Sequence, residues 1–384
     1  MIPRAISAEL HTLLSEYPVV TVLGPRQAGK TTLVRAELPE YDYCNLEYPE
    51  TRNLAREDPK ALLATYSQPT ILDEIQRAPE LLSYIQVLVD EDQRNGRYVL
   101  TGSSQFEIHQ AITQSLAGRT AILTLYPLSI AELVQHGQKS SAWEHAHTGF
   151  LPRIHARKQR PSTAYANYYQ TYVERDVRQL VNIRDTSLFE RFIRLLAGRV
   201  GQCLDKSSLA GDVGTSPRTI ANWLSILEAS FLVYRLPPYF RNFGKRAIKS
   251  PKYYFIDTGL LCYLLGIRSP EQVARDPLVG AIFENLVVGE IIRAQANKGS
   301  RPEIYFFRDS NGAEVDLLIP RGSGFDAVEI KSATTYRQGL LKSLSRIESL
   351  TPEVASRYLI YRGERLKFSN GIKALPYQET ASVV

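Results

Sequence analysis

The sequence has few of the residues that build disulfide frameworks, zinc sites or membrane spans. Its three cysteines, Cys44, Cys203 and Cys262, are far apart and form no Cys-x-x-Cys pair. A disulfide framework or a zinc site is therefore not expected, and a reducing cytoplasm is the expected location. No stretch approaches the roughly 18 uninterrupted apolar residues of a membrane span, and the N-terminus lacks the apolar segment of a signal peptide. We therefore expect no membrane partner.

A large excess of charge of one sign is also missing. Lys and Arg total 46 against 40 Asp and Glu, which gives a net charge of +6. This mildly basic balance permits a polyanionic partner but does not require one. The chain has 384 residues, and at about 150 residues per domain it should form two or three domains. Composition thus leaves the function open, and the motifs must decide it.

The most specific stretch is GPRQAGKT, Gly24–Thr31, which fits the phosphate-binding pattern G-x-x-x-x-G-K-[ST]. It follows an apolar strand, Val19–Leu23, and precedes a helix expected from about Thr31 to Glu37. Backbone N–H groups and the positive helix end hold phosphates in such a loop, and Lys30 reaches the β and γ phosphates. The residues expected to bind ATP are Gly24, Pro25, Arg26, Gln27, Ala28, Gly29, Lys30, Thr31 and Thr32.

Two carboxylates follow a second short apolar strand in PTILDEIQ. We expect Asp73 to hold Mg²⁺ together with the Thr31 hydroxyl, and Glu74 to polarise the attacking water. A later strand in RYVLTGSS ends in small hydroxyl residues that could sense the γ-phosphate. They are Thr101, Ser103 and Ser104.

Arg119 lies between the end of a helix and the fifth strand. An arginine there could stabilise charge on the transferred phosphoryl group, either in its own chain or in a neighbouring subunit of a homo-oligomer. The alternative is a surface arginine at a helix C-terminus, where a cation is favourable in any case.

The blocks GPRQAGKTT, ILDEIQ, VLTGSS and SLAGRTAILTLYPLS together resemble the AAA-type ATPases of prokaryotes that carry a long C-terminal domain of unknown function. The resemblance extends over essentially the whole chain. It implies an α/β fold: a P-loop αβα core with strand order 5-1-4-3-2, then a winged helix-turn-helix, then a restriction-endonuclease-like domain. The expected parts are the ATPase domain at 1–135, a linker and helical connection at 136–185, the winged helix-turn-helix at 186–265 and the nuclease-like domain at 275–384.

The middle of the chain is expected to hold a solvated linker and a helix-turn-helix. Residues 136–164 are rich in His, Ser, Gly, Pro and basic residues, so their histidines are expected to be solvated and not to bind metal. Those histidines are His145, His147 and His155. A helix from Tyr165 to about Leu180 contains Arg175 and Asp176, which could contact nucleotide or bridge domains.

Two short helices from about 206 to 232 have the pattern of a helix-turn-helix, and two β-rich runs after them form a wing. Arg218 opens the second helix and could reach a base or a phosphate of DNA. The wing carries five cations suited to phosphate contacts. They are Arg241, Lys245, Arg246, Lys249 and Lys252. The alternative is a packing module with a solvated basic loop.

The last hundred residues follow the order αβββαβ, which resembles the PD-(D/E)xK nucleases, and GAEVD resembles their archaeal Holliday-junction resolvase version. Residues two apart in a strand face the same side, so Glu329 and Lys331 should project together towards Asp316. The two carboxylates would hold Mg²⁺ or Mn²⁺, Lys331 would help to activate water, and Glu284 would complete the metal ligands. The alternatives are an exposed strand face or a fold kept after catalysis was lost.

The sequence therefore predicts a Mg²⁺-dependent ATP hydrolase that binds DNA and cleaves it at a C-terminal metal site. Two alternatives stay open. One is an ATP-dependent DNA-binding or scaffold module with an inert nuclease fold. The other is a signalling or defence switch gated by nucleotide.

Overall fold

The computed structural model describes residues 2–66, 68–92, 94–103, 112, 115–177, 186–239, 250–308, 313–322, 324–350 and 353–384. The chain forms two compact units. The first comprises Met1–Leu128, Ala229–Phe231 and Ala296–Arg301, and the second comprises Ser129–Glu228, Leu232–Gln295 and Pro302–Val384. Among the described helices, none combines the length and the apolarity needed to cross a membrane. All three cysteines are free thiols.

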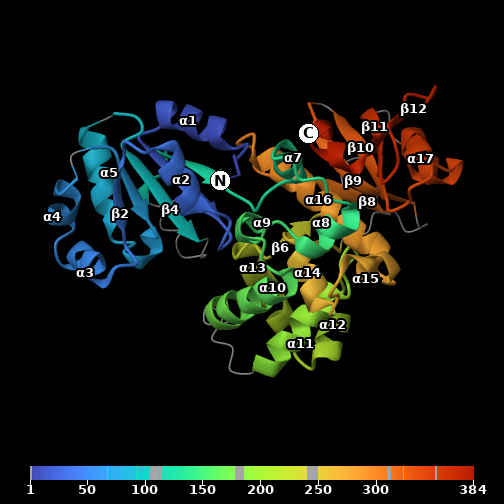
Figure 1. Ribbon diagram of the computed structural model, residues 1–384, viewed down its shortest axis with the longest axis horizontal. Helices are drawn as coiled ribbons and strands as arrows, with labels where there is room; N and C mark the ends of the chain where they lie inside the picture. Colours follow the sequence, from blue (N-terminus) through green and yellow to red (C-terminus); the bar gives the residue numbers. More distant parts are fainter. Residues whose placement is uncertain are drawn as a thin grey trace. The chain divides into compact units, whose positions relative to one another are not determined.

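The first unit is built on a five-stranded parallel sheet in the order β2-β3-β4-β1-β5 (Figure 1). Read from its other edge, this is the 5-1-4-3-2 order that the resemblance implied, and that prediction is confirmed. The strands are β1 (Val19–Gly24), β2 (Asp42–Asn45), β3 (Thr70–Asp73), β4 (Tyr98–Ser103) and β5 (Thr120–Thr124).

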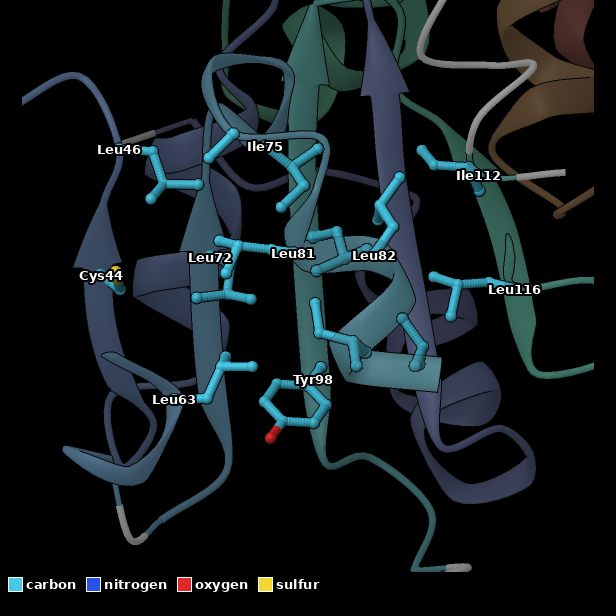
Figure 2. Close-up of a cluster of buried hydrophobic side chains, with 14 of the residues drawn as sticks. Cys44, Leu46, Leu63, Leu72, Ile75, Leu81, Leu82, Tyr98, Ile112 and Leu116 are labelled. Carbon is cyan, nitrogen blue, oxygen red and sulfur yellow. The ribbon is translucent and has the colours of Figure 1, made fainter. Parts of the chain in front are cut away.

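Helices cover both faces of this sheet, which explains why its central strands β1, β3 and β4 are buried at every position. One face packs against α1 (Ser7–Glu16) and α2 (Lys30–Glu37). The other packs against α3 (Pro49–Glu57), α4 (Pro59–Ala64) and α5 (Leu81–Glu91), and Figure 2 shows this second core. Successive strand residues alternate between the two cores. In β1, for example, Val20 and Val22 face α1 and α2, while Val19 and Leu23 face α4 and α5.

The second unit begins with short helices, and those between residues 142 and 164 lie where the sequence suggested a solvated linker. The short helices are α7 (Ile130–Gln135), α8 (Ala142–Thr148), α9 (Pro152–Arg157), α10 (Pro161–Tyr168) and the π-helix η2 (Tyr169–Val177). The prediction that the three histidines are solvated is wrong for two of them, because His145 and His147 are buried in α8. The His145 Nδ1 lies 3.3 Å from the Tyr377 hydroxyl, and burial lowers the pKa of His145 to about 4. Its ring is therefore neutral and structural at physiological pH.

Three helices and a strand pair follow. They are α11 (Thr186–Ala197), α12 (Lys206–Val213), α13 (Pro217–Ala229), and the antiparallel strands β6 (Val233–Leu236) and β7 (Lys252–Phe255). The tight turn expected between two helices separates α12 from α13. Four of the five predicted wing cations, Arg241, Lys245, Arg246 and Lys249, lie outside the described residues.

The C-terminal part carries a six-stranded mixed sheet in the order β12-β13-β11-β10-β9-β8. Helix α17 packs on one face through Leu344 and Ile347, against residues such as Ala327 and Leu359. The helices before and within this part are α14 (Thr258–Leu264), α15 (Pro270–Arg275), α16 (Val279–Ala296) and α17 (Lys342–Leu350). The strands are β8 (Tyr305–Arg308), β9 (Glu314–Arg321), β10 (Gly324–Lys331), β11 (Val354–Tyr361), β12 (Leu366–Lys367) and β13 (Lys373–Pro376), and short 3₁₀ turns lie at Gln338–Leu341 and Tyr377–Val383.

A buried hydrogen-bond network anchors the start of the second unit. Asp257 accepts hydrogen bonds from the Phe150 N–H (2.9 Å) and the Tyr165 hydroxyl (2.7 Å). Gly149 has φ 66° beside this network, and a Cβ there would lie 1.9 Å from the Tyr165 hydroxyl oxygen.

Gly149→Ala should therefore destabilise the second unit more than Gly137→Ala, a matched control with φ 81° and open space around its Cβ position. Both variants lose on the order of 1–3 kcal/mol because each position has a positive φ. Gly149→Ala should lose roughly 1–3 kcal/mol more, because the buried carboxylate loses hydrogen bonds. Urea unfolding of the two variants measures the difference, and equal losses would contradict the packing described.

Candidate functional site

The glycine-rich loop leaves the C-terminal end of β1 and enters α2. Gly24 has φ 152°, and a Cβ there would lie 2.1 Å from the Leu125 carbonyl oxygen, so only glycine fits. Gly29 has φ 93° and directly precedes Lys30, the first residue of α2. Pro25, Arg26, Gln27 and Ala28 form the loop between them, and Thr31 and Thr32 lie in the first turn of the helix.

Lys30 is buried at the centre of this loop, with 6% of its surface exposed. Its Nζ donates hydrogen bonds to the carbonyl oxygens of Gly24 (3.0 Å) and Pro25 (2.9 Å). Burial lowers the pKa of Lys30 to about 8, although the nearby carboxylates of Glu74 and Asp73 oppose this shift. The ammonium group is therefore held inside the loop, at the place where the motif positions phosphates.

The Asp73 carboxylate, at the end of β3, is the hydrogen-bonding centre of the site. It accepts from the hydroxyls of Thr31 (3.0 and 3.1 Å), Tyr43 (2.6 Å) and Thr101. Sequence reasoning missed Tyr43, whose ring also lies 4.6 Å from the Arg35 guanidinium carbon. Threonine and carboxylate oxygens this close together suit Mg²⁺, which takes few protein ligands beside water and phosphate oxygens.

Glu74 directly follows Asp73 and has left-handed backbone angles, φ 59° and ψ 48°. This conformation is uncommon for a residue other than glycine. Its N–H donates to the Thr101 hydroxyl (3.2 Å), and its carboxylate accepts a hydrogen bond from the Gln76 amide. Burial raises the pKa of Glu74, and the positive charge of Lys30 opposes the rise. The structure thus brings Lys30, Thr31, Asp73 and Glu74 together.

Arg119 lies away from this group. Its guanidinium nitrogens are 2.5 and 2.8 Å from the carboxylate oxygens of Asp90 on α5. Its carbonyl accepts from the Val19 N–H at the start of β1, whereas the phosphate loop follows the end of that six-residue strand. At about 3.3 Å per residue, the two are roughly 16–20 Å apart. The structure therefore does not bring Arg119 to the loop of its own chain, and a role in a neighbouring subunit stays a prediction.

The remaining predicted residues of the nucleotide site divide into two groups. Thr101 and Ser103 lie on β4 beside the loop, while Ser104 lies outside the described residues. The backbone of Arg175 and Asp176 belongs to the π-helix η2. Their proposed roles stay predictions.

A second group of charged side chains lies where β9 and β10 run side by side. As the two-residue periodicity predicted, the structure brings Asp316, Glu329 and Lys331 together. The Lys331 Nζ is 3.3 Å from Asp316 Oδ2 and 2.6 Å from Glu329 Oε1. The Ile330 N–H also donates to Asp316 Oδ2 (2.7 Å). The two carboxylates therefore face the same space, and the lysine bridges them.

Lys252 forms a second bridge close to the first, and its predicted role on the wing is wrong. Its side chain is buried, with its Nζ 3.2 Å from Glu284 Oε1 and 2.6 Å from Glu314 Oε1. Paired in this way, Lys252 cannot contact DNA phosphates. Glu284 also accepts a hydrogen bond from the Tyr254 hydroxyl, and it lies inside α16.

Four carboxylates form a cluster here, Glu284, Glu314, Asp316 and Glu329, and burial raises the pKa of two of them, Glu284 and Glu329. Burial, together with the charge of Asp316, raises the pKa of Glu329 to about 8. Burial opposes the charged form of Lys331, but the two carboxylates outweigh it and raise the pKa of Lys331. Glu329 Oε2 is buried and has no hydrogen-bond partner among the described residues. The carboxylate oxygens of this cluster are ligands that suit a hard divalent cation. Among the described residues, however, no group of three or more His, Cys, Asp and Glu side chains is arranged around a metal position.

Comparisons with known proteins agree with the geometry of the first unit. Residues 16–134 match the family described as "AAA domain". Together with the loop, Asp73 and the sheet order, this match defines the first unit as a P-loop AAA-type ATPase domain. Residues 139–271 and 279–380 match two families described as domains of unknown function, DUF8612 and DUF4143.

Relatives cover nearly the whole chain. It is 31% identical to the uncharacterized proteins Rv2008c of Mycobacterium tuberculosis and Mb2031c of Mycobacterium bovis over 376 residues, 97% of this chain and 83% of theirs. The chain belongs to the same family as these mycobacterial proteins. A Haemophilus influenzae protein is 25% identical over 58% of this chain and 57% of its own. Among solved structures, the Walker-type ATPase PABY2304 of Pyrococcus abyssi is similar, with a TM-score of 0.46 and 17% identity over 69% of this chain and 96% of that chain.

Glu329→Gln should change how the stability of the second unit depends on pH. A carboxyl group whose pKa rises from 4.5 to about 8 on folding contributes most below pH 4.5, and the contribution is lost as the pH rises towards 8. The variant lacks this group. Its free energy of unfolding should therefore increase relative to wild type from pH 5 to pH 8, by at most about 1.4 kcal/mol per pH unit.

Urea unfolding in EDTA measures this difference. Asp326→Asn, which removes another buried carboxylate from β10, is the matched control. The assignment would be contradicted if the difference in unfolding free energy between wild type and Glu329→Gln stayed constant with pH. It would also be contradicted if Asp326→Asn showed the same pH-dependent difference.

Proposed function

We propose that this protein hydrolyses ATP with Mg²⁺ at the site formed by the phosphate loop, Asp73 and Glu74. One observation carries the proposal: the Thr31 hydroxyl lies 3.0 Å from the Asp73 carboxylate, with Lys30 and Glu74 beside them. The match to an AAA domain over residues 16–134 supports it.

Each residue has a distinct task in this proposal. The loop N–H groups and Lys30 would hold the phosphates. Thr31 and Asp73 would hold Mg²⁺, which would supply positive charge to the phosphates. Glu74 accepts a proton from the water that attacks the γ-phosphorus. The bond between this phosphorus and the bridging oxygen breaks, and its electron pair leaves with ADP. The raised pKa of Glu74 makes it a stronger base than an exposed carboxylate.

Two variants separate binding from hydrolysis. Lys30→Ala should abolish ATP binding, because it removes the charge that faces the phosphates. Glu74→Gln should still bind ATP but hydrolyse it roughly 100-fold more slowly or worse, because it removes only the base. Calorimetric ATP binding and phosphate release measure the two steps. Glu91→Gln, which changes an exposed glutamate of the same unit, is the control, and a Glu74→Gln variant as fast as wild type would refute the proposal.

A second function is proposed for the other unit: binding of DNA and metal-dependent cleavage of its phosphodiester bonds. The favouring observation is that Asp316, Glu329 and Lys331 converge while Glu329 Oε2 lacks a hydrogen-bond partner among the described residues. Asp316 and Glu329, with Glu284 nearby, would hold Mg²⁺ or Mn²⁺, and the ion would supply an activated water. Lys331 would orient the water once the ion replaced it between the carboxylates.

The arrangement of elements supports this second proposal. The run from α16 through three strands to α17 and β11 follows the αβββαβ order of the PD-(D/E)xK nucleases, a restriction-endonuclease-like fold. Helices α12 and α13 with the β6–β7 pair have the element order of a winged helix-turn-helix, and Arg218 is exposed in the first turn of α13. An exposed cation there suits contact with a phosphate or a base.

Mg²⁺ or Mn²⁺ should stabilise the second unit against urea by about 2.7 kcal/mol at a hundredfold excess over the dissociation constant. Asp316→Ala should remove this stabilisation and any nicking of branched, duplex or single-stranded DNA, and it should leave ATP hydrolysis intact. Asp326→Asn is again the control. Metal binding without nicking would favour an inert module, and nicking only with ATP would favour a gated switch. If Asp316→Ala kept both the metal stabilisation and the nicking, the proposal would be wrong.

A further inference from the structure

Gln76 connects the proposed catalytic base to a neighbouring strand. It lies in the 3₁₀ turn Ile75–Arg77, directly after Glu74. Its side-chain nitrogen donates one hydrogen bond to Glu74 Oε2 and another to the Ser103 hydroxyl oxygen (3.1 Å). These two bonds use both N–H groups of the amide, so one side chain ties Glu74 to the end of β4.

Ser103, at the far end of this bridge, lies beside the phosphate loop. In the register of the parallel strands β1 and β4, Ser103 pairs with Gly24, the first residue of the loop. The carboxyl ends of these strands form the edge at which the loop turns towards the phosphates. The Gln76 bridge therefore runs from the base to the strand end that borders the expected γ-phosphate position.

The packing around Gln76 fixes which way its amide points. An ionised Glu74 carboxylate can only accept hydrogen bonds, so the NH₂ group must face it. The Gln76 Oε1 is then directed at Gly102, where a Cβ would lie only 2.9 Å away. This oxygen is buried and has no hydrogen-bond partner among the residues that the structure describes. Among the described residues, the amide therefore places both of its N–H groups on Glu74 and Ser103, and its oxygen on no partner.

We propose that Gln76 is a positioning residue for ATP hydrolysis. It holds the Glu74 carboxylate against the end of β4, in the orientation from which the carboxylate accepts a proton from the attacking water. The proposal rests on the proposed hydrolysis at Glu74. Glu74 needs such a support because its left-handed backbone places the side chain on a short turn with no other described hydrogen-bond donor to its carboxylate. In this proposal Gln76 acts through Glu74 and not by direct contact with ATP or the water.

The test compares turnover with affinity. Gln76→Met has nearly the size of glutamine but cannot donate hydrogen bonds. It should lower kcat for ATP roughly 10- to 100-fold, the scale expected for a misplaced catalytic group, while KM for ATP changes less than twofold. Gln68→Met, at an exposed position of the same unit, should leave both values unchanged. A Gln76→Met variant with wild-type kcat, or with an effect on KM alone, overturns the proposal.

A double-mutant cycle shows whether Gln76 acts through Glu74. In the Glu74→Gln background, adding Gln76→Met should not slow hydrolysis further, because the group that Gln76 positions is already gone. An additional 10-fold loss in that background would mean that Gln76 acts elsewhere, and it would overturn the proposal. If Gln76→Met does not fold, Gln76→Asn takes its place with the same expected split between kcat and KM, because its shorter side chain cannot span Glu74 and Ser103.

The outcomes separate this proposal from the one on which it rests. If Glu74→Gln hydrolyses ATP as fast as wild type, the proposed function fails, and the role of Gln76 fails with it. If Glu74→Gln is inactive while Gln76→Met, or Gln76→Asn where Gln76→Met does not fold, is fully active, only the positioning role is overturned.

Discussion

The nucleotide site depends on how one buried carboxylate is satisfied. A buried charge is costly unless hydrogen bonds compensate it, and Asp73 receives three from hydroxyls on α2, β2 and β4. These bonds draw the helix behind the phosphate loop and two neighbouring strands to the end of β3. Glu74 follows in the next position, with its N–H bonded to the same Thr101 that serves Asp73. The geometry of the candidate base is therefore a consequence of the geometry of the candidate metal ligand.

Local patterns predicted the loop, and tertiary contacts explain what was missed. The strand, the loop from Gly24 and the helix after it are adjacent in sequence, so their structure follows from the motif. The sheet order came from the resemblance, not from periodicity. Arg119 could not be placed, because its partner Asp90 is 29 residues away. Gln76 is the last residue of the ILDEIQ motif, but its hydrogen bond to Ser103 forms only in the folded sheet.

In the second unit too, local patterns predicted some of the contacts, and tertiary contacts explain what was missed. Strand periodicity correctly brought Asp316, Glu329 and Lys331 together, because residues two apart share a face. The burial of Lys252 depends on Glu284 and Glu314 from other elements, which no local pattern reveals. The linker error was avoidable. Inside the predicted linker, Ser141 and Glu144 form a capping box, a readable signal for the start of α8.

The central claim is that Thr31, Asp73 and Lys30 form a site for Mg²⁺ and the phosphates of ATP. A crystal structure with Mg²⁺ and a non-hydrolysable ATP analogue tests it most directly. We predict that the Thr31 hydroxyl leaves Asp73 and lies about 2.1 Å from Mg²⁺, and that Lys30 Nζ leaves the Gly24 and Pro25 carbonyls for a phosphate oxygen. A structure in which the analogue binds elsewhere, while both groups keep their present partners, would contradict the account.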